Sequence, residues 1–376
     1  MSIYDKVQTF IHSPAPDLFE RLAWEVFNHQ FETIEPYRRF CEQQRAYPAA
    51  ISSIDSVPAV SNVAFKFVDL TQQPGAPHPD ARVFLTSGTT QGRDRRGRHV
   101  VPRPEIYRAS ALAHLRTMLF PDARRMAMLA MHPTADLMPE SSLSPMITWC
   151  VEEFGTGTRL AAASRSSVDV DAAIRFLGDR EARREPVCIL GTTASFAALF
   201  TALGERAKKI GRPASSRLMD TGGAKGQATP LAARDVIRLA GELLALPPAM
   251  VINEYGMTEL CSQLYDATPF NCAESGASSE RFKVAPPWMR VTARDPVTLR
   301  PVADGEMGLL TFFDLANVGS VSAVMTEDLG TVESGRVRVV GRIDAGDARG
   351  CALSIEQFAA AERSQPVDAG RFEASR

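Results

Sequence analysis

The sequence lacks the features that would take it to a membrane or to nucleic acid. Among its 376 residues no apolar run approaches the roughly 18 residues of a membrane span. The formal net charge is −2, so no overall field attracts DNA, RNA or an anionic membrane. The N-terminus, MSIYDKVQTFIHS, has neither the basic start nor the long apolar run of a signal peptide. We therefore expect a cytoplasmic protein with no membrane span and no nucleic-acid partner.

Zinc-binding patterns are also missing from the sequence. The six cysteines form no CxxC pair, and no group of cysteines and histidines has the spacing of a zinc site. We expect these thiols to be reduced and mostly buried. Lysine is scarce too, and it occurs only at positions 6, 66, 208, 209, 225 and 283. A lysine inside a motif is therefore a candidate for a specific role.

Through the middle of the chain, strand-like runs alternate with helix-like runs. RMAMLAMHP, PVCILGTTA, SRLMDTGG and AMVINEY are typical of buried strands, and amphipathic segments separate them. This alternation predicts an α/β fold with mostly parallel sheets flanked by helices. Among the helices, we expect Asp169 or Asp171 to cap one N-terminus and Gly211 to end another.

The rest of the chain divides around this α/β region. Before it, DLFERLAWEVFNHQF places Leu18, Leu22, Val26 and Phe27 on one helix face, and the proline-rich TQQPGAPHPD follows. After about residue 280, strand-like runs are joined by Asp, Gly and Pro turns. We predict an N-terminal helical segment with a linker, an α/β core, a small β-rich subdomain and a short tail, at 1–80, 81–278, 279–344 and 345–376.

Residues 83–99, VFLTSGTTQGRDRRGRH, carry the most informative motif. A strand-like run leads into a loop of small hydroxyl residues and glycines, and a basic cluster follows. Backbone N–H groups and hydroxyls in such a loop converge on one anion, and glycines allow close approach. The loop is not a Walker A motif, because GxxxxGK[ST] is absent, and an ordinary turn is the alternative. We expect it to bind the phosphates of ATP, through Thr86, Ser87, Gly88, Thr89, Thr90 and Gly92.

Later motifs supply other groups that ATP would need. In EYGMTE, Tyr255 offers a flat face to a purine, Thr258 an oxygen near the α-phosphate, and Glu259 a hard ligand for Mg²⁺. Asp328 suits a ribose diol, and Arg342 suits a ribose or a phosphate. Each motif alone is compatible with an ordinary surface loop.

Three candidate loops each follow a predicted strand. They are Thr86–Gly92, Thr221–Gly226 and Tyr255–Glu259. Ligands of α/β sheets bind beyond the carboxyl ends of the strands, so we expect these loops to form one site. We therefore add Gly222, Gly223 and Gly256 to the predicted ATP-binding residues.

In this order, TSGTTxG, YGMTE, DLG and GRxD resemble the motifs of the adenylate-forming superfamily, which includes acyl-CoA synthetases, adenylation domains and luciferases. The resemblance spans about residues 80–344 and implies the large-domain fold of that superfamily, with ATP and Mg²⁺ as cofactors. It implies that Tyr255 stacks on adenine, Glu259 holds Mg²⁺, Asp328 binds the ribose hydroxyls and Arg342 contacts ribose at a hinge.

Two departures from that superfamily stand out. The usual Pro-Lys pair after the phosphate loop is replaced, and Arg93, Arg95 and Arg96 are candidate substitutes for the lost cation. Only 32 residues follow Asp344 and none is lysine, so we expect the C-terminal lid domain and its active-site lysine to be absent.

The chain also resembles a narrower family, the acyl-protein synthetases of the LuxE type, and this resemblance fits the expected absence of the lid domain. It rests on the segments SSLSPM (141–146), TGGAKG (221–226) and RGC (349–351), with Leu353 after them. This resemblance implies that acyl-AMP forms and that the acyl group passes to Cys351, and then to a partner acyl reductase. Neighbouring arginines would favour the thiolate, and an inert buried cysteine is the alternative.

Other residues complete the expected site. Lys225 would take the place of the missing lid lysine, with a surface lysine as an equal alternative. His132, Ser141 and Ser142 would face the acid substrate, and one of the two serines would also cap a helix. His132 would otherwise be a structural histidine.

The sequence therefore predicts an ATP- and Mg²⁺-dependent ligase that activates a carboxylic acid, by resemblance a fatty acid, and transfers it to a protein thiol. The first alternative is an acyl- or aryl-acid ligase whose acceptor is CoA or the phosphopantetheine of a carrier protein. The second is a nucleotide-binding regulatory protein without activity. The oligomeric state has no signature in the sequence.

Overall fold

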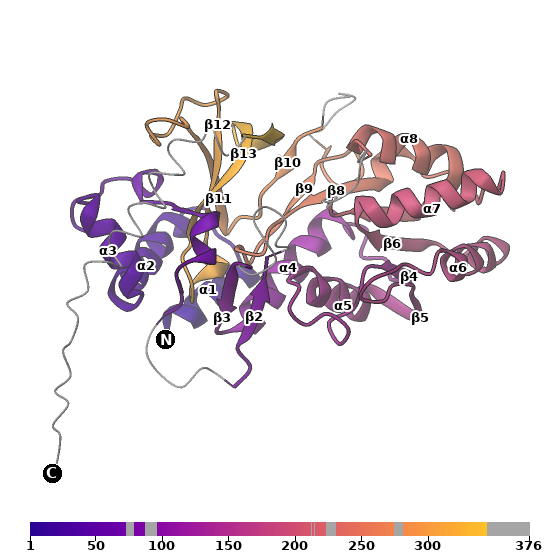
Figure 1. Ribbon diagram of the computed structural model, residues 1–376, viewed down its shortest axis with the longest axis horizontal. Coiled ribbons are helices and arrows are strands. Elements are labelled where there is room, and N and C mark those ends of the chain that lie inside the picture. Colours follow the sequence, from indigo (N-terminus) through magenta and orange to yellow (C-terminus); the bar gives the residue numbers. More distant parts are fainter. Residues whose placement is uncertain are drawn as a thin grey trace, which may run out of the picture.

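The computed structural model describes residues 1–72, 79–86, 96–211, 213, 215–222, 231–273 and 281–343. Helices and strands alternate through the middle of the chain, as the sequence predicts (Figure 1). The α-helices are α1 (Ile3–His12), α2 (Leu18–Thr33), α3 (Glu35–Gln43), α4 (Pro104–Met118), α5 (Leu143–Phe154), α6 (Val170–Ala182), α7 (Thr193–Glu205) and α8 (Ala233–Leu244). The strands are β1 (Val60–Ser61), β2 (Arg82–Leu85), β3 (Arg98–Val101), β4 (Met126–Met131), β5 (Gly155–Ala161), β6 (Val187–Gly191), β7 (Arg217–Asp220), β8 (Val251–Tyr255), β9 (Leu264–Asp266), β10 (Lys283–Val284), β11 (Met289–Arg294), β12 (Met307–Asp314), β13 (Ala323–Glu333) and β14 (Arg336–Arg342).

One large mixed sheet organises the chain. Its strand order is β11-β12-β13-β14-β10-β9-β8-β7-β6-β4-β5, and β1 pairs with β13. From β5 to β8 all neighbours are parallel, whereas β8 to β11 are joined by antiparallel pairs. The α/β fold is confirmed, but the expectation of mostly parallel strands holds only for this first part. Antiparallel neighbours need no crossover helix, and the described residues beyond β8 contain no α-helix between strands.

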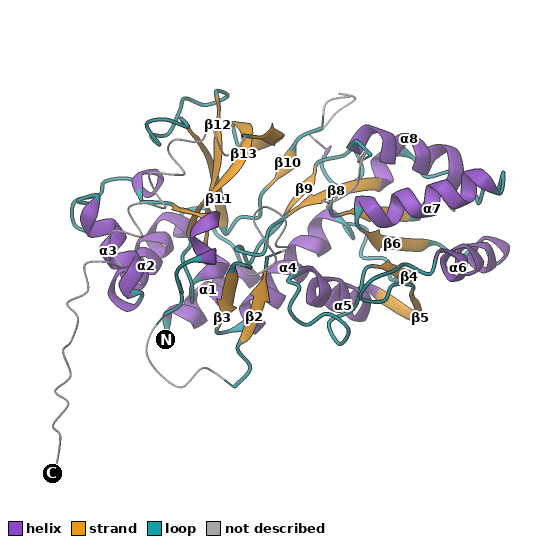
Figure 2. Cartoon of the chain, viewed as in Figure 1, coloured by secondary structure: helices purple, strands orange, loops and turns teal. Residues whose placement is uncertain are grey.

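Helices cover both faces of the parallel part of the sheet (Figure 2). Along β4, Ala127, Leu129 and Met131 belong to the core cluster shared with α6, α7 and α8. The alternate residues, such as Met128 and Ala130, belong to the cluster that includes side chains of α4 and α5. Successive side chains of a strand point to opposite faces, so the fully buried β4 requires an apolar partner layer on each side.

The N-terminal helices pack at the other end of the sheet (Figure 1). Leu22, Val26 and Phe27 of α2 are buried and Leu18 packs against the same core, so the predicted apolar face is confirmed. Gln30, on the same helix, reaches the loop after β12, where its amide nitrogen donates to Ser322 Oγ at 2.9 Å. None of the described helices is both long enough and apolar enough to span a bilayer.

Two predicted helix boundaries are decided by the structure. The carboxylate of Asp169, and not that of Asp171, caps α6 by accepting from Ala172 N at 2.8 Å. The prediction that Gly211 ends α7 is wrong, because the helix ends at Glu205. There Ala207 adopts φ 48°, and Lys208 N donates to Leu203 O, so a non-glycine residue takes the left-handed position that closes a helix.

A buried arginine holds the base of the parallel sheet. The Arg217 side chain on β7 is completely buried, and its guanidinium binds both carboxylate oxygens of Asp122 at 3.1 and 2.9 Å. It also donates to Leu119 O and lies over the rings of Phe120 and Phe270. Burial raises the pKa of Asp122, but the bonds and charge of Arg217 outweigh it, and the pKa lies below its ordinary value.

We predict that Arg217→Leu lowers the free energy of unfolding by about 2–3 kcal/mol, since it removes two hydrogen bonds to Asp122 and leaves the buried carbonyl of Leu119 without this donor. This loss of stability is limited because the Asp122 side chain is 30% exposed and water can solvate its carboxylate. Urea unfolding measures the effect, with Arg159→Leu on the exposed side of β5 as the control. A carboxylate with a lowered pKa stabilises the fold above its ordinary pKa, so the difference from wild type shrinks as the pH falls below 3.8. A difference that stays constant into acid would contradict this account.

Candidate functional site

The candidate site lies where the parallel strands end. β4, β6, β7 and β8 are consecutive neighbours that run the same way, so their carboxyl ends form one edge. His132, Gly222 and Tyr255 stand at this edge, as the sequence predicts from strand direction. Three strand spacings, roughly 14 Å, separate the strand that leads to His132 from the strand that ends at Tyr255.

Tyr255, Asp328 and Arg342 form one hydrogen-bonded cluster. The Tyr255 hydroxyl donates to Asp328 Oδ2 at 2.7 Å, and Arg342 Nε donates to Asp328 Oδ1 at 2.9 Å. Asp328 and Arg342 are direct partners in the β13–β14 ladder, which brings two distant sequence motifs together. Phe312 stacks against Tyr255 with ring centroids 5.9 Å apart. Burial, with the charge of Asp328, holds the pKa of Tyr255 well above its ordinary value, so the phenol keeps its proton.

Gly222 forms the turn at the end of β7. Its φ of +66° lies in the left-handed region, which favours glycine. Its N–H donates to Asp220 Oδ1 at 3.1 Å, and its carbonyl accepts from Thr193 N at 2.9 Å. This turn therefore connects β7 to the N-terminus of α7.

The base of the predicted phosphate loop is held by the β2–β3 hairpin. Thr86 N donates to Gly97 O at 2.9 Å, and Gly97 N donates to Thr86 Oγ1 at 2.8 Å. Arg96 Nε donates to Thr86 O at 2.6 Å and a second nitrogen to Leu85 O. Arg96 thus holds the start of the loop with at least two of its five N–H groups.

Thr258 and Glu259 are held through their backbone. The Thr258 carbonyl lies 2.7 Å from Nδ1 of His99, and the Glu259 carbonyl accepts from Asn317 Nδ2 at 2.9 Å. The Glu259 side chain is buried. Asn317 had no place in the sequence prediction, and His99 entered it only as part of the basic cluster that follows the loop.

His132 lies next to a serine other than the predicted ones. Its Nε2 is 3.3 Å from Ser144 Oγ in the first turn of α5, and burial lowers the pKa of His132 to about 4. Ser142 occupies the N-cap position, but its side chain makes no capping bond. The prediction of a serine cap is wrong at Ser142, where the backbone is helical and not extended as in a capping residue.

The predicted acid-binding segment contacts the hairpin. Leu85 N donates to Glu140 O at 2.8 Å, and the Tyr107 hydroxyl donates to Ser142 O at 2.9 Å. Tyr107 also packs edge-on against Phe84 of β2. Ser141 and Ser142 therefore lie beside the strand that leads into the phosphate loop.

Several predicted site residues lie outside the described residues. They are Ser87, Gly88, Thr89, Thr90, Gly92, Gly223, Lys225 and Cys351, together with Arg93 and Arg95. Their roles stay predictions, as do the roles of the residues placed above.

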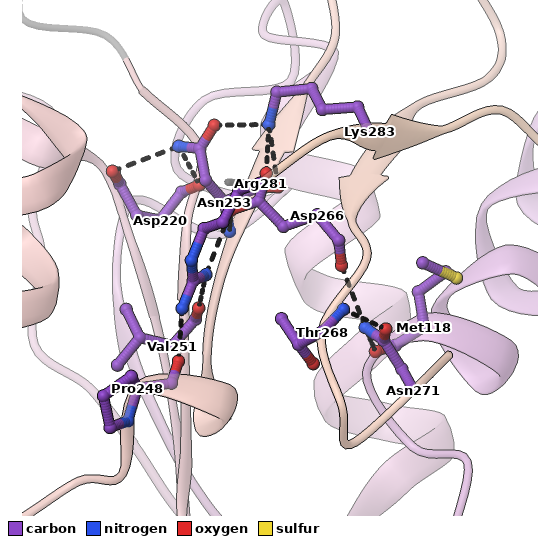
Figure 3. A network of polar contacts seen from close by, with 10 residues as sticks. All are labelled: Met118, Asp220, Pro248, Val251, Asn253, Asp266, Thr268, Asn271, Arg281 and Lys283. Atoms are coloured by element: carbon purple, nitrogen blue, oxygen red, sulfur yellow. Dashed lines mark hydrogen bonds and ion pairs between the residues drawn. The ribbon is translucent and has the colours of Figure 1, made fainter. Parts of the chain in front are cut away.

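Figure 3 shows a polar network that the sequence did not reveal. It includes Asp220, whose carboxylate also accepts from Gly222 N. Asn253 Nδ2 donates to Asp220 Oδ2 at 3.2 Å, and Lys283 Nζ donates to Asn253 Oδ1 at 2.6 Å and to Asp266 Oδ1 at 3.1 Å. These residues come from four neighbouring strands, β7 to β10. The scarcity of lysine was the one signal that pointed to Lys283; its partners depend on strand pairing.

Glu254 is a buried carboxyl group on the opposite face of β8 from Asn253. Burial raises its pKa from 4.5 to about 8, although the charge of Lys283 lowers it. Because Glu254 keeps its proton at neutral pH, it adds no negative charge to a site expected to bind phosphates.

Glu259 is the residue that we expect to bind Mg²⁺ in this site. Within the described ranges no group of three or more His, Cys, Asp or Glu side chains could hold a metal ion. Mg²⁺ in nucleotide sites is bound by one or two carboxylates together with phosphate oxygens, so a single carboxylate beside a triphosphate fits this ion. Glu259 as its ligand stays a prediction.

Comparison with known families identifies the chain. The family model for the acyl-protein synthetase LuxE matches residues 12–359. The chain belongs to the LuxE acyl-protein synthetase family. The resemblance read from the sequence motifs is thereby confirmed.

Two curated relatives of this LuxE-family chain carry the same name, long-chain-fatty-acid–luciferin-component ligase. The protein of Aliivibrio fischeri is 39% identical over 82 residues, which are 19% of this chain and 22% of that protein. The protein of Vibrio harveyi is 35% identical over 86 residues, 21% of this chain and 23% of that protein. The matched segments thus span less than a quarter of either relative.

Solved structures show the same fold. A 2-hydroxyisobutyryl-CoA ligase in complex with 2-HIB-AMP and CoA is 16% identical, with a TM-score of 0.64 over 89% of this chain and 70% of that chain. Its open conformation gives a TM-score of 0.60 with 17% identity, over 86% of this chain and 73% of that chain. The LuxE-family chain therefore has the fold of an adenylate-forming enzyme.

We predict that wild-type stability falls as the pH rises from 4.5 towards 8, relative to Glu254→Gln. Over that range the folded protein keeps the Glu254 proton and the unfolded chain releases it, so unfolding is favoured by rising pH. The neutral amide has no such dependence. Urea unfolding at several pH values measures the difference, with Glu205→Gln at the exposed end of α7 as the control. Parallel pH profiles for wild type and Glu254→Gln would show that Glu254 is ionised in the fold.

Proposed function

We propose that this chain is an ATP-dependent ligase that activates a carboxylic acid as acyl-AMP and transfers the acyl group to the thiol of Cys351. The observation that supports it best is the Tyr255–Asp328–Arg342 cluster at the carboxyl edge of the sheet, in a chain of the LuxE family. A fatty acid is the proposed substrate, since the curated relatives are named long-chain-fatty-acid ligases. An acyl reductase is the proposed next acceptor.

The proposed reaction has two steps. In the first, a carboxylate oxygen attacks the α-phosphorus in line, and the bond to pyrophosphate breaks, which yields acyl-AMP. In the second, the Cys351 thiolate attacks the acyl carbon, and AMP leaves as the thioester forms. Mg²⁺, when bound, supplies positive charge to the phosphate oxygens.

The cluster is suited to hold adenosine. Phe312 supports one face of Tyr255, and adenine would stack on the other. The bonds from Tyr255 and Arg342 fix the Asp328 carboxylate, and each of its oxygens still has a lone pair for a ribose hydroxyl. The Arg342 side chain is 48% exposed, so its remaining N–H groups can reach the ribose.

The phosphates and the acid would lie between the hairpin and the edge of the sheet. Thr86–Gly92 would bind the β- and γ-phosphates, Thr258 the α-phosphate, and Lys225 the charge that develops there. His132 is neutral at physiological pH because burial lowers its pKa, so with Ser141 and Ser142 it would line a pocket for an uncharged acyl chain.

The decisive experiment follows a radiolabelled acid in the presence of ATP and Mg²⁺, without CoA. We predict label on wild-type protein that hydroxylamine releases, and no label on Cys351→Ser, because a serine hydroxyl does not replace the thiolate. ATP–pyrophosphate exchange with a panel of acids measures the first step separately, and Cys351→Ser retains this exchange.

The control is Cys272→Ser, since Cys272 is a half-buried cysteine among the described residues, and it should label like wild type. Label that persists on Cys351→Ser would exclude that cysteine. Label that appears only on added CoA or a carrier protein would favour the alternative ligase, and no exchange with any acid would favour a regulatory protein.

A further inference from the structure

One buried histidine, His99, lies between the loop after β8 and the predicted phosphate loop. His99 lies on β3, is 1% exposed, and places Nδ1 2.7 Å from the carbonyl oxygen of Thr258. A carbonyl oxygen can only accept, so this hydrogen bond forms in the tautomer that carries its proton on Nδ1. Nε2 lies 2.8 Å from Asn317 Oδ1, which is also an acceptor, so a neutral ring donates to one of these two oxygens.

Asn317 holds the next carbonyl of the same loop. Its Nδ2 donates to Glu259 O at 2.9 Å and to Val321 O at 2.8 Å. Gln30 of α2 donates in turn to the backbone carbonyl of Asn317 at 3.2 Å. The consecutive carbonyls of Thr258 and Glu259 are therefore bound by two side chains that contact each other and that belong to other parts of the chain.

The same short segment also binds Thr86, the first residue of the predicted phosphate loop. Arg96 and Gly97, two and three residues before His99, bind Thr86 through its carbonyl, N–H and hydroxyl groups. Phe65 packs edge-on against the His99 ring, with centroids 5.7 Å apart, which restricts the ring. Residues 96–99 therefore contact both loops that are proposed to bind phosphate.

We propose that His99 is a positioning residue that fixes the Thr258–Glu259 segment relative to the phosphate loop, so that both loops meet the same triphosphate. The inference rests on the proposed function for its effect on catalysis, but the link itself can be tested without activity. Its loss would let the Thr258 and Glu259 backbone shift, and shifts of about 1 Å cost up to 100-fold in rate.

The test compares three variants. His99→Leu removes the donor, and His99→Asn keeps one, because an asparagine Nδ2 stands in the place of Nδ1. His114→Leu is the matched control, since His114 is also a buried histidine with one hydrogen bond to a backbone carbonyl, that of Val284. We expect His99→Leu to lower the kcat of ATP–pyrophosphate exchange 10- to 100-fold with the KM of the acid within twofold, and His99→Asn to regain at least threefold. His114→Leu should stay within threefold of wild type.

Amide hydrogen exchange gives a readout that needs no substrate. We expect at least tenfold faster exchange of the amides from Met257 to Leu260 in His99→Leu, and wild-type rates there in His114→Leu. Equal rates in the two variants, or no gain with His99→Asn in active protein, would overturn the proposal. Absence of pyrophosphate exchange in wild type would instead reject the proposed function, while the amide rates would still decide whether His99 holds the loop.

Discussion

The site depends on the parallel alignment of β4, β6, β7 and β8. Each of these strands delivers the residues that follow it to the same edge of the sheet, whatever their separation in the sequence. His132 and Tyr255 are more than 100 residues apart in the sequence, with Gly222 between them, and all three meet there for this reason. Helices on both faces keep the strands buried, so the edge is the part of this sheet that can receive a ligand.

The antiparallel strands β13 and β14 add further side chains to the site at that edge. β13 and β14 run antiparallel in a register that sets Asp328 opposite Arg342, and the Tyr255 hydroxyl reaches the same carboxylate. The carboxylate is thereby held by two donors from two different strands. A group fixed in this way loses little freedom when it binds a ligand.

Buried polar groups hold the loops around this edge. Lys283, Asn253, Asp266 and Asp220 bond across four strands, and His99 and Asn317 bind two consecutive carbonyls of the loop after β8. Buried polar groups are costly unless they are paired. Such networks therefore favour one arrangement of the loops over many, which suits a site that is proposed to orient a triphosphate.

The sequence was enough to predict the α/β class, the buried strands and most of the helices, because periodicity and local turn residues act over short distances. It also determined the family, since TSGTTxG, YGMTE, DLG, GRxD and RGC are local motifs. The folded chain was needed to find the mixed sheet, the end of α7 at Glu205 and the partners of Asp328, Lys283 and His99. These features depend on which strands become neighbours and in what register, and pairings between distant residues leave no local pattern in the chain.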